Sequence, residues 1–257
     1  MDLKLNALLA SDEPSPVTIH NPGGTSPLLL VADHAANRIP RALGDLGVTA
    51  AERARHIGWD IGIAGVSRRL ADALDAVLIQ QNYSRLVIDC NRPPGVPSSM
   101  PEISEATAIP GNVDLTEAQK AVRIAEIFRP YHDAIETELK RRLEKGQPVA
   151  LVAMHSFTPV YKGFVRPWHA GVLYNRDDRF SKRFKALLDA EGDFVVGDNE
   201  PYTVDDLTDY TIPVHGEKRG LHHIAIEIRQ DLIADEDGQA AWAGRLARLL
   251  PQTYASL

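Results

Sequence analysis

Short, almost wholly apolar runs alternate along this chain with longer runs in which apolar residues recur every three or four positions. Seven of the short runs are rich in β-branched residues and predict strands: Leu28–Ala32, Val77–Gln81, Leu86–Cys90, Val149–Met154, Gly171–Tyr174, Phe194–Val196 and His223–Ile228. Strands that are apolar on both faces are typical of a parallel sheet covered by helices. The pattern therefore predicts an α/β fold around a largely parallel sheet.

Four longer runs have helical periodicity: Ile61–Leu74, Asp114–Lys145, Asp178–Ala190 and Gly238–Leu250. Within the second run, Pro130 should kink the helix or divide it, because proline lacks the backbone donor. Asp114 has the position of an N-cap residue, with Glu117 as the reciprocal acid three residues later.

Two long segments between these elements are irregular. Asn91–Gly111 contains five prolines, and Asn199–Gly220 is rich in polar side chains. Long loops inside a compact fold are usually functional. The sequence shows neither an internal repeat nor a change in composition, so we expect residues 1–257 to form a single domain.

Charge and cysteine content limit the possible partners and location. The 257 residues include 35 acidic and 28 basic side chains, for a net charge of −7, and the longest basic run is Lys140-Arg141-Arg142. We therefore do not expect nucleic acid as a partner. A single cysteine, no secretory signal pattern, and no run of about 18 apolar residues predict a cytoplasmic protein without a membrane span.

Three positions carry candidate chemistry. Asp33-His34 and His155 each follow a predicted strand directly, and Glu227 lies within an apolar strand. Ligands collect beyond the carboxyl ends of strands in α/β sheets. Two histidines and an acid could hold a zinc ion with an open position for water, and Glu227 could then act as the base, because apolar neighbours raise a carboxyl pKa.

Structural alternatives exist for each of these residues. A histidine at a strand end is more often structural, and Glu227 could pair with Arg229. Asp60 precedes a predicted helix, where it could be an N-cap or a third metal ligand.

Other polar residues leave similar choices open. Asn91-Arg92 could bind a carboxylate or form a loop salt bridge. Four further residues lie in comparable polar settings, and the sequence does not choose among their roles: Arg85, Arg166, Tyr202 and His215.

Seven blocks of sequence resemble the N-formylglutamate amidohydrolase family, in the family order and from about Leu28 to Trp242. The blocks are DHAANRIP, HIGWDIG, YSRLVIDCNRP, MHSFTPVY, RPWHAGVLYN, GDNEPY and IEIRQDLI. This family is similar in fold to the zinc carboxypeptidases and aspartoacylases. The resemblance implies an α/β fold with a mixed, mostly parallel sheet, flanked by helices on both faces.

The resemblance also implies roles for particular residues. His34 and His155 match the two histidine ligands of a zinc ion, Glu227 matches the base, and Asn91-Arg92 matches the pair that binds the substrate carboxylate. The carboxypeptidase pattern has a glutamate ligand three residues after the first histidine, where this chain has Asn37. We expect Asp60 to supply the missing oxygen; the alternatives are that Asp33 supplies it or that metal binding is weakened.

The implied reaction is hydrolysis of N-formyl-L-glutamate by zinc-activated water, giving formate and glutamate. Arg166, Arg229 and Lys162 are candidates for binding the second carboxylate of such a substrate, and His215 is a further substrate-binding candidate. We expect a monomer or a small homo-oligomer.

Three alternatives remain. The enzyme could act on another N-acyl amino acid or resemble a carboxypeptidase, or the chain could be a metal-free binding protein, as the Asn37 departure suggests. A serine hydrolase is disfavoured, because the chain has no Gly-x-Ser-x-Gly motif.

Overall fold

A mixed seven-stranded sheet organises the computed structural model, which describes residues 7–257. The strand order is β1-β3-β2-β6-β11-β9-β10. The strands are β1 (Val17–His20), β2 (Leu28–Ala32), β3 (Val77–Gln81), β6 (Ala150–Phe157), β9 (Ala170–Leu173), β10 (Val196–Asp198) and β11 (His222–Arg229). The four central strands are parallel, whereas β1 and β9 run antiparallel to β3 and β11. The predicted mixed, mostly parallel sheet is therefore confirmed.

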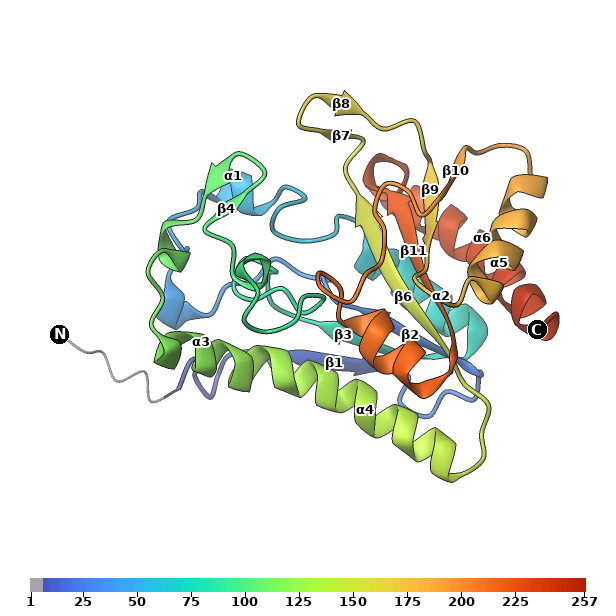
Figure 1. The fold of residues 1–257 in the computed structure, drawn as a ribbon, viewed down its shortest axis with the longest axis horizontal. Coiled ribbons are helices and arrows are strands. Elements are labelled where there is room, and N and C mark those ends of the chain that lie inside the picture. The colour runs from blue at the N-terminus through green and yellow to red at the C-terminus, as the bar shows by residue number, and fades with distance from the viewer. Residues whose placement is uncertain (1–6) are drawn as a thin grey trace.

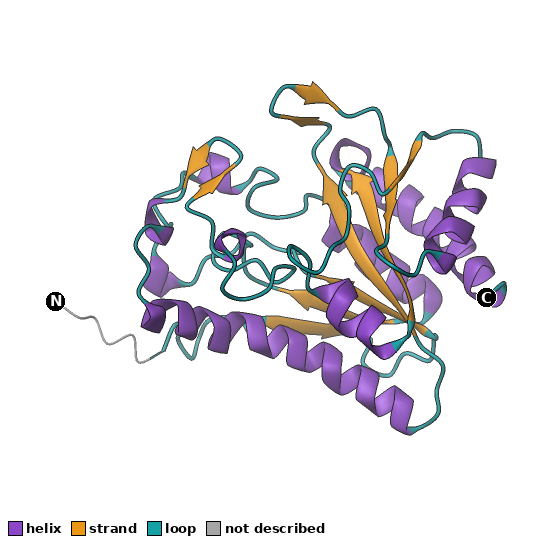
Figure 2. Ribbon diagram, in the orientation of Figure 1, coloured by secondary structure: helices purple, strands orange, loops and turns teal. Residues whose placement is uncertain are grey.

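Helices cover both faces of this sheet, as Figures 1 and 2 show. On one side lie α2 (Ile63–Leu74), α5 (Arg179–Ala190) and α6 (Glu236–Ala255). On the other side lie α3 (Glu117–Arg123), the π-helical turn η4 (Ile124–Phe128) and α4 (Arg129–Glu144).

The alternation of side chains along β2 explains the two cores. Leu28 and Leu30 pack with α2, α5 and α6, whereas Leu29 and Val31 pack with α4. Successive residues of a strand point to opposite faces, so a strand between two helical layers must be apolar throughout.

The remaining elements are short. They are α1 (Ala50–Arg53), the hairpins β4–β5 (Ile103–Ser104 and Thr107–Ala108) and β7–β8 (Val160–Tyr161 and Phe164–Val165), and the turns η1 (Arg41–Leu43), η2 (Pro97–Ser99), η3 (Pro110–Asn112), η5 (Ile212–Gly216), η6 (Glu217–Arg219) and η7 (Gln230–Ile233). No helix in the described part of the chain combines the length and apolar character needed to cross a membrane.

The predicted strand Leu86–Cys90 is wrong. This segment is a buried turn, which begins where the backbone N–H of Val87 donates to the carbonyl of Ser84 at 2.9 Å. Leu86, Val87 and Ile88 are all buried in the core. Their apolar character therefore reflects burial and not extended structure.

Smaller differences concern boundaries. β1 was not predicted, and β10 begins two residues later than the predicted Phe194–Val196. Strand β6 extends to Phe157, so His155 lies inside the strand and not after it.

The long predicted helix begins and divides differently from the prediction. Its N-cap is Thr116, which forms a capping box with Gln119, whereas Asp114 has a left-handed φ of 53°. The π-helical turn η4 ends immediately before Arg129-Pro130, where α4 begins. The predicted division near Pro130 is thus present, because a wider turn accommodates the missing backbone donor.

Candidate metal centre and active-site cleft

A cleft of about 650 Å³ lies at the carboxyl ends of the parallel strands. His34 follows the end of β2, while His155 and Glu227 lie near the ends of β6 and β11. These two strands pair in parallel with Glu227 directly opposite His155. The sheet therefore brings together three side chains that are far apart in the sequence.

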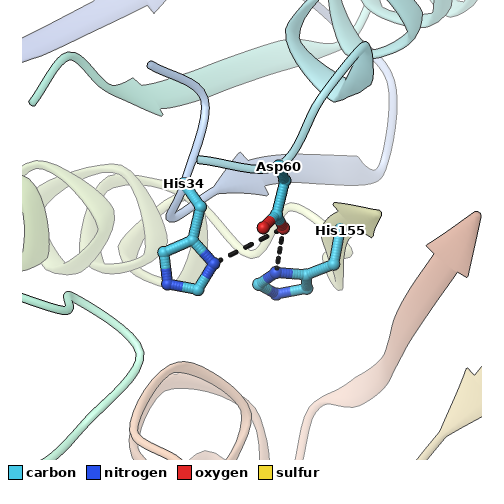
Figure 3. Close-up of side chains that lie close together, drawn as sticks. All are labelled: His34, Asp60 and His155. Atoms are coloured by element: carbon cyan, nitrogen blue, oxygen red, sulfur yellow. Dashed lines mark hydrogen bonds and ion pairs between the residues drawn. The ribbon is translucent and has the colours of Figure 1, made fainter. Parts of the chain in front are cut away.

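His34, Asp60 and His155 form a compact buried cluster in this cleft (Figure 3). One ligand atom from each residue lies within 4.8 Å of the others. The Asp60 Oδ2 atom is 3.4 Å from Nδ1 of His34 and 3.1 Å from Nδ1 of His155. Both imidazoles thus direct the same type of nitrogen toward one carboxylate.

Two further carboxylates contact the opposite nitrogens of these rings. Asp89 Oδ1 lies 2.8 Å from His34 Nε2, and Asp33 Oδ2 lies 3.2 Å from His155 Nε2. In metal sites, a carboxylate on the second ring nitrogen usually orients the ligating histidine. Asp33 therefore lies on the far side of His155 from Asp60, outside the cluster of possible ligands.

The donor set fits a catalytic zinc ion. Two imidazole nitrogens and one carboxylate oxygen leave the fourth position of a tetrahedral site open. The Nδ1 atom of His34 is buried without a hydrogen-bond partner in the structure, although it faces Asp60. A cation between these groups would satisfy it.

The three carboxylates of this site are ionised. Burial alone would raise the pKa of Asp33, but its hydrogen bond with His155 holds the pKa at about 2. Burial likewise opposes ionisation of Asp60, but His34 holds its pKa below the ordinary range. Burial also opposes ionisation of Asp89, whose pKa is held below the ordinary range by Arg85 and His34. These acids in turn raise the pKa of His34 and of His155, although burial opposes this, so without a metal the charges of the carboxylates are balanced by the two imidazolium groups and Arg85.

Asp60 is not the N-cap of the following helix. That position belongs to Gly62, which has a φ of 81° and lies so close to Ile233 that a Cβ atom would be 2.1 Å from its carbonyl oxygen. The Asp60 backbone N–H donates to the His34 carbonyl at 2.9 Å, and its carboxylate accepts from the Ser156 N–H at 3.2 Å. These bonds hold the Asp60 carboxylate between the two histidines.

Asn37 lies outside this cluster. Its side-chain amide donates to the carbonyl of Arg53 at 3.5 Å. The carboxylate oxygen that lies beside His34 and His155 comes from Asp60, in a different segment of the chain.

Glu227 is buried beside the cluster, with only 6% of its surface exposed. Burial raises its pKa from 4.5 to about 7, although nearby His155 opposes the rise. Its Oε2 atom has no hydrogen-bond partner in the structure. A carboxyl group with such a pKa is suited to exchanging protons near neutral pH.

Arg166 is a buried cation in the wall of the cleft, and only 5% of the residue is exposed. Its guanidinium lies 4.7 Å from the Tyr202 ring and 4.9 Å from the Tyr161 ring, and it donates to the Tyr202 hydroxyl at 3.0 Å. Within residues 7–257, no carboxylate forms an ion pair with it. Because a buried charge without a counter-ion is costly, this site favours an anionic ligand.

Asn91 and Arg92 also line the cleft, but both take part in contacts between the two long loops. The Asn91 amide donates to Asp209 at 3.0 Å, and its oxygen accepts the backbone N–H of Thr211 at 3.0 Å. Arg92 contacts the carbonyl of Thr208 and pairs with Asp209 at 3.4 Å. The loop salt bridge considered from the sequence is therefore present.

His215, Arg229 and Lys162 do not line the cleft, so the structure does not support their expected contact with substrate. His215 stacks on His132, with 2.9 Å between their ring nitrogens. Arg229 pairs with Asp231 at 2.8 Å. His132 and Asp231 are therefore the polar partners of His215 and Arg229, and no substrate group is needed to explain why these two residues are polar.

Asp89 was missed by the sequence analysis. It lies in the apolar run Leu86–Cys90 and also binds Arg85, at 2.6 Å. Like Glu227, Asp89 is a carboxylate in an apolar segment, and this feature of the sequence marks it as a candidate site residue.

Comparisons with known proteins show the family and the fold. Residues 26–234 match the family model described as N-formylglutamate amidohydrolase. The crystal structure of gene product Atu2144 from Agrobacterium tumefaciens is 40% identical, covers 97% of this chain and 98% of its own, and has a TM-score of 0.93. The N-formylglutamate amidohydrolase from Ralstonia eutropha JMP134 is 19% identical, over 94% of this chain and 98% of its own, with a TM-score of 0.68, and shares the fold. A comparison with curated proteins gives no match.

Proposed function

Because the chain belongs to the N-formylglutamate amidohydrolase family, and so is a hydrolase of amide bonds, we propose that it is a metal-dependent deformylase. Its substrate would be N-formyl-L-glutamate or a closely similar N-acyl amino acid, and its products would be the acid and the free amino acid. The observation that carries this proposal is the buried cluster of His34, Asp60 and His155 beside Glu227.

The residues that would hold the metal are His34 and His155, through their Nδ1 atoms, and Asp60. Zinc bound there would supply a Lewis acid that polarises the substrate carbonyl and lowers the pKa of water to about 7. Asp89 and Asp33 would keep the two imidazoles oriented, since each contacts the ring nitrogen that faces away from the cluster.

Glu227 would move the proton. Its carboxylate lies one strand away from His155 and has a free buried oxygen. It takes a proton from the attacking water and then delivers this proton to the nitrogen of the leaving amine. A pKa of about 7 allows both steps at neutral pH, because neither form is strongly favoured.

Two arginines would bind the carboxylates of the substrate. Arg166 is buried between aromatic rings and has no acidic partner among the described residues, so a substrate carboxylate would provide its counter-charge. Arg92 would bind the α-carboxylate through Nε and Nη2, because its contacts with Asn91, Thr208 and Asp209 all use Nη1 and hold its loop in place. Two cations in one cleft favour a dicarboxylic substrate over a neutral N-acyl amino acid.

A substrate panel tests this proposal. The purified chain would be incubated with N-formyl, N-acetyl and N-succinyl derivatives of glutamate and of leucine, with and without a metal chelator, and the release of free amino acid would be measured. We expect N-formylglutamate to be hydrolysed fastest and the chelator to abolish turnover. Undiminished turnover after complete metal removal would contradict the metal-dependent mechanism, and preference for a leucine derivative would contradict the two-arginine argument.

A further inference from the structure

Thr211 joins the substrate side of the cleft to the metal side. It immediately precedes η5 and is completely buried. Its hydroxyl donates to Asp33 Oδ1 at 2.8 Å, although the two residues are 178 positions apart in the sequence. Its backbone N–H donates to the Asn91 side-chain oxygen at 3.0 Å.

The bond to Asp33 matters because of what Asp33 contacts. Its second oxygen, Oδ2, lies 3.2 Å from Nε2 of His155 and has no hydrogen bond with another group in the described structure. A hydrogen bond from a buried hydroxyl to one carboxylate oxygen limits the rotation of the carboxylate and so the direction of its other oxygen. The Tyr131 hydroxyl, on α4, also lies close to Asp33. The Thr211 hydroxyl is the donor with a 2.8 Å hydrogen bond to Asp33, and it therefore helps to set the direction in which Asp33 faces the imidazole.

We infer that Thr211 is a positioning residue for the metal ligand His155, and acts through Asp33. The chain of contacts runs from the Thr211 hydroxyl to Asp33, then to Nε2 of His155, which leaves Nδ1 directed at Asp60. The inference rests on the metal centre of the proposed function. It means that the Asn199–Gly220 loop contributes to metal affinity as well as to the substrate side of the cleft.

Three substitutions at this position separate the hydroxyl from the rest of the side chain. Thr211→Val keeps the shape and removes the hydroxyl, Thr211→Ala removes both, and Thr211→Ser keeps the hydroxyl. None of them changes the backbone N–H that binds Asn91. Zinc affinity of the metal-stripped full-length variants would be measured by competition with a chromophoric chelator, and the melting temperature of each metal-free variant would be recorded.

Partners of metal-bound histidines typically change metal affinity by about 10–100-fold when removed. Because Thr211 is one step further away, we expect Thr211→Val and Thr211→Ala to weaken zinc binding about tenfold, whereas Thr211→Ser stays within about threefold of the wild type. At saturating zinc, KM should remain unchanged, since the Asn91 contact is retained. If Thr211→Val does not fold, the comparison of Thr211→Ala with Thr211→Ser gives the same information.

The measurements distinguish failure of the Thr211 inference from failure of the proposed function. Equal zinc affinity in the wild type and in Thr211→Ala, or an equal loss in Thr211→Ser, would overturn the role of the hydroxyl. A raised KM with unchanged zinc affinity would also overturn it. A wild-type chain that binds no zinc would instead contradict the proposed function, and with it the premise of this inference.

Discussion

Replacing Glu227 with glutamine should remove activity and at the same time stabilise the metal-free fold. The two side chains have nearly the same shape, but glutamine can neither accept the water proton nor become charged. General-base catalysis is typically worth about 10²–10⁴-fold. We therefore expect kcat of Glu227→Gln to fall by at least about a hundredfold, with a much smaller change in KM.

The stability change follows from the pKa of Glu227. Burial raises this pKa from 4.5 to about 7, so folding favours the protonated form. The stabilising contribution is complete below pH 4.5 and is lost as the pH rises through about 7. At about 1.4 kcal/mol per pKa unit, an ionised Glu227 costs the fold roughly 3 kcal/mol at pH 8 and above. Glutamine carries no such cost.

The assay is chemical denaturation of the metal-free wild type and Glu227→Gln at pH 4.5 and at pH 8.5. The variant should be more stable than the wild type at pH 8.5, by up to about 3 kcal/mol, and equally stable at pH 4.5. Glu138→Gln is a matched control on α4. Although burial opposes ionisation, Arg141 and Arg142 hold the Glu138 pKa below its usual value, so this variant should lose stability at pH 8.5 and keep full activity. A Glu227→Gln variant that is less stable than the wild type at pH 8.5, or that keeps more than a tenth of its kcat, would refute the reasoning.

Two further predictions concern the metal and substrate sites. Asp89→Asn should weaken zinc binding about 10–100-fold, measured by chelator competition, because an amide is a weaker acceptor than a carboxylate for the Nε2 proton of His34. Unchanged zinc affinity would show that Asp89 forms only its ion pair with Arg85. Arg166→Met should raise KM for N-formylglutamate by about tenfold or more with little change in kcat, because a charge-assisted contact with the substrate is lost. Arg166→Lys keeps the charge and should recover part of this loss. An equal KM in the wild type and Arg166→Met would exclude a substrate carboxylate at this position.

The fold was largely predictable because the apolar pattern within each short segment indicates whether that segment is a buried strand or an amphipathic helix. The alternation of leucines on β2 between two cores appears in the sequence as an unbroken apolar run, and this run requires helices on both faces. The strand predicted at Leu86–Cys90 was wrong because an apolar run shows only that a segment is buried. A buried turn and a buried strand give the same apolar pattern. The half-exposed β1 has too weak an apolar signal to be recognised.

The residues that strands place at the site were predictable from the sequence, whereas Asp60 was expected as a ligand from the family resemblance. His34, His155 and Glu227 were expected to meet, because the carboxyl ends of neighbouring parallel strands lie at one edge of the sheet. The partners of the remaining side chains depend on tertiary contacts. His215 resembled a site residue, but its partner is His132 on α4, whereas Thr211 gave no signal and yet contacts Asp33.

Anomalous diffraction at the zinc absorption edge, from crystals grown with zinc, tests the central claim most directly. We expect one strong peak at about 2.0–2.2 Å from Nδ1 of His34, Nδ1 of His155 and a carboxylate oxygen of Asp60. We also expect Asp89 and Asp33 to remain on the Nε2 atoms of the two rings. A peak bound through Nε2, or a zinc ion elsewhere with this cluster empty, would contradict the account.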